Sequence, residues 1–255
     1  MRQPWTTGRE LRELDDLDDQ ALARVYAYPQ DLTRPYVRVN FVSSLDGSVS
    51  VDGRSGGLGS AADKRVFGLL RRLAEVVLVG AGTVRTEDYR GARRATIGRD
   101  TPPPIAVVTG SADLDPHSRL LTDTSVPPIV LTTTAAPAQR RRRLRAAGAD
   151  VVELPTLAPH AVLGELDRRE LRRVLCEGGP RLHGDLVNAD AVDELCLTLS
   201  PLLVAGHAGR IATGPAGPDP RPMTLVGALH ADDVLLLRYA RPRGDRSLPQ
   251  PGDNP

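Results

Sequence analysis

Residues 174–184, VLCEGGPRLHG, give the clearest indication of how this chain is built. They begin as a short apolar strand, turn at Glu177 and two glycines, and continue into a segment that can form a helix. Residues 76–84, VVLVGAGTV, repeat the design. A glycine turn between strand and helix offers backbone N–H groups and a positive helix end to a phosphate. Two such turns indicate an elongated phosphorylated ligand, such as a dinucleotide, although each is also compatible with a plain tight connection.

Composition favours a small-molecule partner. The 255 residues fit one large domain, and 33 basic against 32 acidic side chains favour neither nucleic acid nor an anionic membrane. Cys176 and Cys196 are the only cysteines, so we expect two buried thiols and neither a disulfide framework nor a zinc site. Because no segment resembles a signal peptide or an uninterrupted membrane span, the sequence predicts a cytoplasmic protein.

Strand and helix patterns alternate along most of the chain, which predicts right-handed βαβ units and a mostly parallel sheet. No helix pattern separates the last two strands, so we expect antiparallel pairing at a C-terminal edge. The predicted fold class is a three-layer αβα sandwich. Strands are expected at 36–41, 75–79, 105–109, 129–132, 151–154, 174–177, 193–200 and 234–239, and helices at 61–73, 138–147, 160–173 and 181–187.

Three parts of the chain are expected. Residues 1–33, with leucines at 11, 14 and 17, predict an extension of short helical pieces laid over the domain. Residues 34–240 form the domain itself, including a long loop rich in serine and glycine after the first strand that suits ligand binding. Residues 206–222 read as a mobile Gly/Pro segment, and the polar, proline-containing residues 241–255 as a disordered tail.

Two local patterns have a plain structural reading. Ser60 followed by Asp63 resembles a capping box at the start of the helix at 61–73. The five arginines at 140, 141, 142, 143 and 145 favour a solvated helix face over a nucleic-acid patch, because no aromatic residue lies among them.

Four stretches form a pattern more specific than either glycine turn: NFVSSLDG (40–47), LLRRLAEVVLVGAGTV (69–84), VLCEGGPRLHG (174–184) and VDELCLTLSPLLVAG (192–206). Together they resemble the reductase domain of bacterial riboflavin biosynthesis, a pyrimidine reductase family with a dihydrofolate-reductase-like fold. The resemblance extends from about residue 34 to residue 239. It implies a homodimeric enzyme that uses NADPH to reduce a ribosylaminopyrimidine 5′-phosphate and opens the sugar ring into a ribityl chain.

The resemblance also implies roles for individual residues. Glu177 and Asp46 are the expected catalytic residues, with Asp46 and Ser44 near the nicotinamide and substrate, and Arg71 as a contact for substrate phosphate. Glu87 stands where the family usually has aspartate. The expected cofactor contacts are Gly80, Gly82, Thr83, Glu87, Gly178, Gly179, Pro180, Arg181 and Leu182.

Five of these residues can also have a purely structural role. A carboxyl group at a strand end can hold a pyrimidine edge and, if burial raises its pKa, donate a proton, and Glu177 is the best candidate. Glu177 can instead bond neighbouring backbone N–H groups and only shape the turn. Arg71 can be an exposed helix residue, with Arg72 as the alternative contact. Three others can serve local structure: Ser44 and Asp46 in a turn, and Thr83 as a helix N-cap.

Departures from the family keep other functions open. Leu58 stands where many bifunctional members carry a tryptophan, which motivates a relaxed pterin reductase as an alternative. The zinc deaminase signature is absent, so the companion deamination is expected in another protein. Residues 90–94 lack a clear counterpart, which leaves a non-catalytic NADP-binding regulatory protein as a second alternative. For the 2′-phosphate of NADPH, the sequence offers Thr109, Ser111 and residues 132–134.

Overall fold

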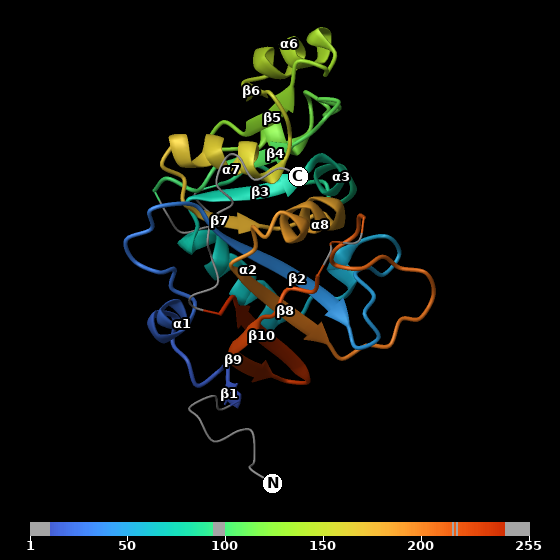
Figure 1. Ribbon diagram of the computed structural model, residues 1–255. Helices are drawn as coiled ribbons and strands as arrows, with labels where there is room; N and C mark the ends of the chain where they lie inside the picture. Colours follow the sequence, from blue (N-terminus) through green and yellow to red (C-terminus); the bar gives the residue numbers. More distant parts are fainter. Residues whose placement is uncertain (1–10, 94–99, 216, 218, 243–255) are drawn as a thin grey trace.

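The computed structural model describes residues 11–93, 100–215, 217 and 219–242. Their strands form a 10-stranded sheet in the order β1-β9-β10-β8-β2-β7-β3-β4-β5-β6, which Figure 1 shows from β1 at the bottom of the view to β6 near the top. The strands are β1 (Leu11–Glu13), β2 (Tyr36–Ser44), β3 (Val76–Gly80), β4 (Ile105–Val108), β5 (Ile129–Thr133), β6 (Asp150–Leu154), β7 (Arg173–Cys176), β8 (Glu194–Ser200), β9 (Thr224–Ala231) and β10 (Val234–Ala240).

Pairing within the sheet confirms the predicted mixed architecture. From β8 through β2, β7, β3, β4 and β5 to β6, neighbouring strands are parallel. β10 pairs antiparallel with both β8 and β9. The chain moves outward from β3 to β6 and then returns to the middle of the sheet as β7, so that β7 lies between β2 and β3. This change of direction creates a crevice at the carboxyl ends of the central strands.

Helices cover both faces of the sheet, as the sequence predicts. Along β3 the side chains alternate: Val77 and Val79 pack with the cluster under α2, whereas Val76 and Leu78 pack with the cluster under α7 and α8. Buried residues of α1, α3, α5 and α6 join the α2 side, which makes three layers. The helices are α1 (Asp19–Val25), α2 (Ala61–Leu73), α3 (Ala81–Thr86), α5 (Arg119–Thr122), α6 (Ala138–Ala146), α7 (Pro159–Arg168) and α8 (Pro180–Asn188), with a 3₁₀ turn η1 (Ser55–Gly57).

The structure confirms the Ser60 half of the predicted capping box and the solvated arginine-rich helix. Ser60 is the N-cap of α2, and its hydroxyl oxygen accepts a hydrogen bond from the Asp63 backbone N–H over 3.0 Å. In α6 only Leu144 is buried, and Arg141 and Arg145 pair with Glu153, so the arginine-rich helix is a surface element. Among the helices that the structure describes, none is long and apolar enough to cross a membrane.

Three predictions about elements were wrong or incomplete. The helix expected to continue to Arg173 ends at Arg168, because Glu170 takes a positive φ of 61° and Arg173 already belongs to β7. Strand β9, which pairs with both β10 and β1, was not expected. Residues 11–13, expected as helical, form the edge strand β1, so the N-terminal segment is part of the sheet.

The N-terminal segment also belongs to the core. Leu14, Leu17, Leu22 and Tyr26 are almost completely buried in the cluster on the α2 side. Both cysteines are buried and free, as predicted. Most of the expected C-terminal tail, residues 243–255, lies outside the described residues.

A buried charge cluster joins the strands that precede the site. Arg38 of β2 and Glu194 of β8 are both 0% exposed and form an ion pair over 2.9 Å. Arg238 of β10 pairs with the same carboxylate over 2.6 Å. Burial raises the pKa of Glu194, but the two guanidinium groups outweigh it and hold that pKa below its ordinary value. The cluster therefore ties β2 and β10 to the strand between them, β8.

Candidate active site

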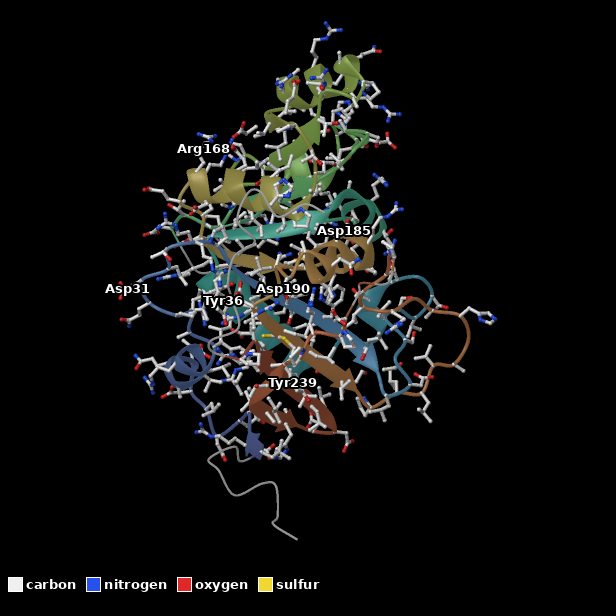
Figure 2. The ribbon with its side chains drawn as sticks, in the orientation of Figure 1. Asp31, Tyr36, Arg168, Asp185, Asp190 and Tyr239 are labelled. Atoms are coloured by element: carbon white, nitrogen blue, oxygen red, sulfur yellow. The ribbon has the colours of Figure 1, made fainter. Side chains whose placement is uncertain are left out.

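A cavity of about 1100 Å³ lies at the carboxyl ends of the central parallel strands. Its walls come from β2, the loop after it, α2, and the turns that follow β3, β4 and β7. Figure 2 labels Asp185 of α8, one of the lining residues, near the ends of β3 and β7, whereas Tyr36 lies at the opposite side of the sheet where β2 begins. Predicted site residues lining this cavity are Arg71, Gly80, Gly82, Thr83, Glu87, Glu177, Gly179, Pro180, Arg181 and Leu182.

The two glycine turns meet at this edge and form one wall. The Gly80 backbone N–H donates to the Gly178 carbonyl over 2.8 Å. Gly178 has a φ of +94°, which disfavours any other residue, and its peptide bond to Gly179 is cis. A Cβ on Gly179 would collide with the Thr83 hydroxyl of the other turn. The close approach therefore depends on glycine at both positions.

This wall fits the phosphates of a dinucleotide. Helix α8 begins at Pro180 with Gly179 as its N-cap, and glycine has no side chain to cap that end. Because Gly179 and Pro180 line the cavity, the positive end of α8 is directed at it. Across the turn, a Cβ on Gly82 would meet nothing within 4 Å, which leaves space for a ligand.

Glu177 lies at the centre of a buried polar network. Leu175 packs on the α2 side of the sheet, so the alternation of side chains puts Glu177 on that side as well. Its carboxylate accepts two hydrogen bonds from Arg71, through Nε and Nη2, each over 2.7 Å. The Tyr89 hydroxyl donates to the same carboxylate over 2.6 Å. The idea that Glu177 only bonds neighbouring N–H groups is therefore wrong.

Electrostatics holds this network together. Burial raises the pKa of Tyr89 well above its ordinary value, and the Glu177 carboxylate raises it further. Burial alone would lower the pKa of Arg71, but the adjacent carboxylate outweighs burial, so the pKa is raised. The three hydrogen bonds all require acceptor lone pairs, so the carboxylate serves as an acceptor. Arg71 is thus engaged with Glu177, and its expected contact with a substrate phosphate stays a prediction.

Ser44 and Asp46 lie apart from this network. Asp46 lines a second cavity of about 450 Å³, beside Ala205 and Ile211. The Ser44 hydroxyl donates to the Asp46 carboxylate, which also accepts from the Val204 and Ala205 backbone N–H groups over 3.1 and 2.7 Å. These contacts describe a turn that anchors the loop after β8. The expected place of both residues beside the nicotinamide and substrate stays a prediction.

The same contacts lower the pKa of the Asp46 carboxyl group. The Ser44 hydroxyl, followed by the N–H group of Ala205, lowers the Asp46 pKa to about 2. The carboxylate thus keeps its bonds at neutral pH and loses them only as the pH falls through about 2. We expect the amide signals of Val204 and Ala205 to titrate with that midpoint by NMR, and the titration to vanish in Asp46→Asn. A midpoint at the ordinary value of about 3.9 would contradict the geometry.

Other predicted residues have roles of their own in the structure. The Glu87 carboxylate accepts from the Ser55 backbone N–H over 2.9 Å, which ties the loop after β2 to the end of α3. Thr83 is not an N-cap, because Gly80 occupies that position. Leu58 is only 2% exposed and packs in the interior, so it does not line the cavity where a stacking residue was considered.

Sequence reasoning missed several cavity residues. Tyr89 carries no sequence signal, because its partner Glu177 is far away in the chain. Asp63 and Phe67 do carry one, since they precede Arg71 by eight and four residues and so share a side of α2 with it. The sequence analysis treated Asp63 as part of a cap and Phe67 as a core residue. Taken together with Arg71, their spacing of four residues predicts one side of a helix that lines a polar site.

Known proteins similar to this chain agree with the fold and the sequence pattern. The family described as the RibD C-terminal domain matches residues 35–237. The chain is 30% identical over 189 residues to the 2,5-diamino-6-ribosylamino-4(3H)-pyrimidinone 5′-phosphate reductase of Methanothermobacter thermautotrophicus, covering 73% of this chain and 87% of the relative. It is 29% identical over 185 residues to the riboflavin biosynthesis protein RibD of Mycobacterium tuberculosis, covering 72% of this chain but only 47% of that longer protein.

A solved structure has the same fold. The crystal structure of a pyrimidine reductase-like protein from Corynebacterium diphtheriae superposes with a TM-score of 0.74, covering 87% of this chain and 98% of that one at 24% identity. The likeness confirms the predicted fold. With the sequence match over residues 35–237, it follows that this chain belongs to the family of the RibD C-terminal domain.

Proposed function

We propose that the protein is an NADPH-dependent reductase that converts a ribosylaminopyrimidine 5′-phosphate into the ribitylamino product of riboflavin biosynthesis. The observation that carries this proposal is that the Glu177 network and the paired glycine turns share one cavity. One wall suits the phosphates of a dinucleotide, and the other offers a fixed carboxylate to a heterocycle. The name of the archaeal relative supports the substrate class.

The cofactor wall can be assigned to particular groups. A nicotinamide cofactor, which the family implies, supplies a hydride when bound. Gly179, Pro180 and Arg181 at the start of α8 would hold its pyrophosphate, and Gly80 and Gly82 would allow its close approach. For the 2′-phosphate that distinguishes NADPH from NADH, we propose Thr109 and Ser111, because both line the cavity. Thr132, which the sequence also suggested for the 2′-phosphate, is 0% exposed and does not line the cavity.

The substrate wall positions a ring and excludes water. Arg71 and Tyr89 fix the Glu177 carboxylate in one orientation, so that it can accept a hydrogen bond from an N–H group of the pyrimidine edge. Phe67 lies beneath the Arg71 guanidinium at 4.6 Å from the ring centroid and adds an apolar surface to the cavity. We also propose that the protein is cytoplasmic and forms a homodimer. Sedimentation of the purified protein measures its oligomeric state.

A steady-state assay of NADPH oxidation tests the proposal. We expect turnover with the ribosylaminopyrimidine 5′-phosphate, none above background with dihydrofolate, and a lower dissociation constant for NADPH than for NADH. Turnover with the pterin alone would favour the pterin reductase. That alternative was based on Leu58 in place of a tryptophan, and the burial of Leu58 weakens it. NADPH binding with no turnover of either substrate would favour a non-catalytic regulatory protein.

A further inference from the structure

Asp63 places a carboxyl group in the large cavity, on the α2 side and apart from the Glu177 network. It lies on the same side of α2 as Phe67 and Arg71, and all three residues line the cavity. With a rise of about 1.5 Å per residue, the step of eight positions from Asp63 to Arg71 spans ~12 Å of helix. Asp63 therefore faces a different part of the cavity from the Glu177 network.

One hydrogen bond orients this carboxyl group. Thr198 of β8, which is only 3% exposed, donates from Oγ1 to Asp63 Oδ1 over 2.7 Å. The other oxygen lies close to Gly59, where a Cβ would come within 3.4 Å of Oδ2. Because Gly59 has no side chain and also lines the cavity, the space beside Oδ2 is available to a substrate.

The surroundings of Asp63 favour a carboxyl group that carries a proton. Burial raises the pKa of Asp63, and the Thr198 hydroxyl and the neighbouring Lys64 only partly offset this. Glu177 instead accepts three hydrogen bonds, two of them from a guanidinium group. Asp46 has a pKa of about 2 and lines the other cavity. Among Asp63, Glu177 and Asp46, only Asp63 combines a place in the large cavity with a pKa raised by burial, and both properties suit a proton donor.

We propose that Asp63 is the proton donor of the reduction, an inference that rests on the proposed function. In the overall reaction a hydride with its electron pair adds to the anomeric carbon of the ribosylamine, and the bond from that carbon to the ring oxygen breaks. The carbon is reduced and the nicotinamide is oxidised. The ring oxygen keeps the bonding electrons and takes one proton, which Asp63 provides before it is reprotonated from solvent.

The variant Asp63→Asn tests this role. Asparagine keeps the size of the side chain and an oxygen for Thr198, but it has no proton to transfer. We expect kcat/KM with the pyrimidine phosphate to fall by about a hundredfold or more. The dissociation constant for NADPH and the melting temperature should stay at wild-type values. In the wild type, kcat/KM should fall as the pH rises through the Asp63 pKa, because the protonated form is required, and this limb should be absent from the variant.

A control and a second variant separate the outcomes. Asp19→Asn removes an exposed first-turn acid from α1, outside the cavity, and should behave as the wild type. Thr198→Val removes the donor that lowers the Asp63 pKa, so the limb should move to higher pH; this variant decides the question if Asp63→Asn does not fold. Two results would overturn the role of Asp63 but leave the proposed function standing. One is an active Asp63→Asn protein whose kcat/KM still falls with rising pH as in the wild type, and the other is a Thr198→Val protein in which this fall occurs at the same pH as in the wild type. Absence of turnover in the wild type would instead refute the proposed function, and this inference with it.

Discussion

Arg71→Ala is expected to lower the free energy of unfolding by about 3–5 kcal/mol, because it leaves a buried carboxylate without its ionic partner. The Glu177 side chain is only 2% exposed and that of Arg71 19%, so solvent replaces the two lost hydrogen bonds only in part. Urea unfolding of the purified variants measures the loss. The same variant should have little reductase activity, because the carboxylate no longer has a fixed orientation.

A surface pair provides the control for this prediction. Arg168 also donates two hydrogen bonds to a glutamate, Glu165, over 2.7 and 2.8 Å, but its side chain is 67% exposed. Arg168→Ala should therefore lower the free energy of unfolding much less than Arg71→Ala does. In the double variant Arg71→Ala/Glu177→Gln the unpaired charge is gone, so the combined loss should be clearly smaller than the sum of the single losses. Additive losses, or a cost at Arg71 no larger than at Arg168, would show that the network is not the buried unit described here.

Gly178→Ala is expected to destabilise the protein by roughly 1–3 kcal/mol and to weaken NADPH binding at the same time. Gly178 has a φ of +94°, and a Cβ there would come within 3.1 Å of the Phe41 ring. The Phe41 ring is itself stacked on His183, with centroids 5.0 Å apart, which limits how far it can move. The turn must therefore shift, and with it the N-terminal end of α8. Urea unfolding and a fluorescence titration with NADPH measure the two effects.

Gly164→Ala is the matched control for that substitution. Gly164 lies within α7, and a Cβ there would meet nothing within 4 Å. Alanine should stabilise the helix by about 0.5–1 kcal/mol and leave the NADPH dissociation constant unchanged. If Gly178→Ala bound NADPH as tightly as Gly164→Ala, the turn after β7 would not be part of the cofactor site.

The sequence predicts the paired glycine turns better than the Glu177 network. Both glycine turns and the Ser60 cap are short-range patterns, in which neighbouring residues determine the local backbone. Tyr89 and Thr198 become part of the site only through contacts with Glu177 and Asp63, which lie 88 and 135 residues away in the chain. No local pattern reports such a pair. Strand β9 was missed for a similar reason, since its partly buried residues form a strand through pairing with β10 and β1.

We expect cofactor and substrate to meet in the cavity between the paired glycine turns and the Glu177 network. A crystal structure of the protein with NADPH and the ribitylamino product would show whether they do. We predict the pyrophosphate at Gly179–Arg181, the nicotinamide inside the large cavity, and the pyrimidine against Glu177. A nicotinamide bound in the smaller cavity beside Asp46 and Ala205 would show that the Glu177 network is not where the reaction takes place.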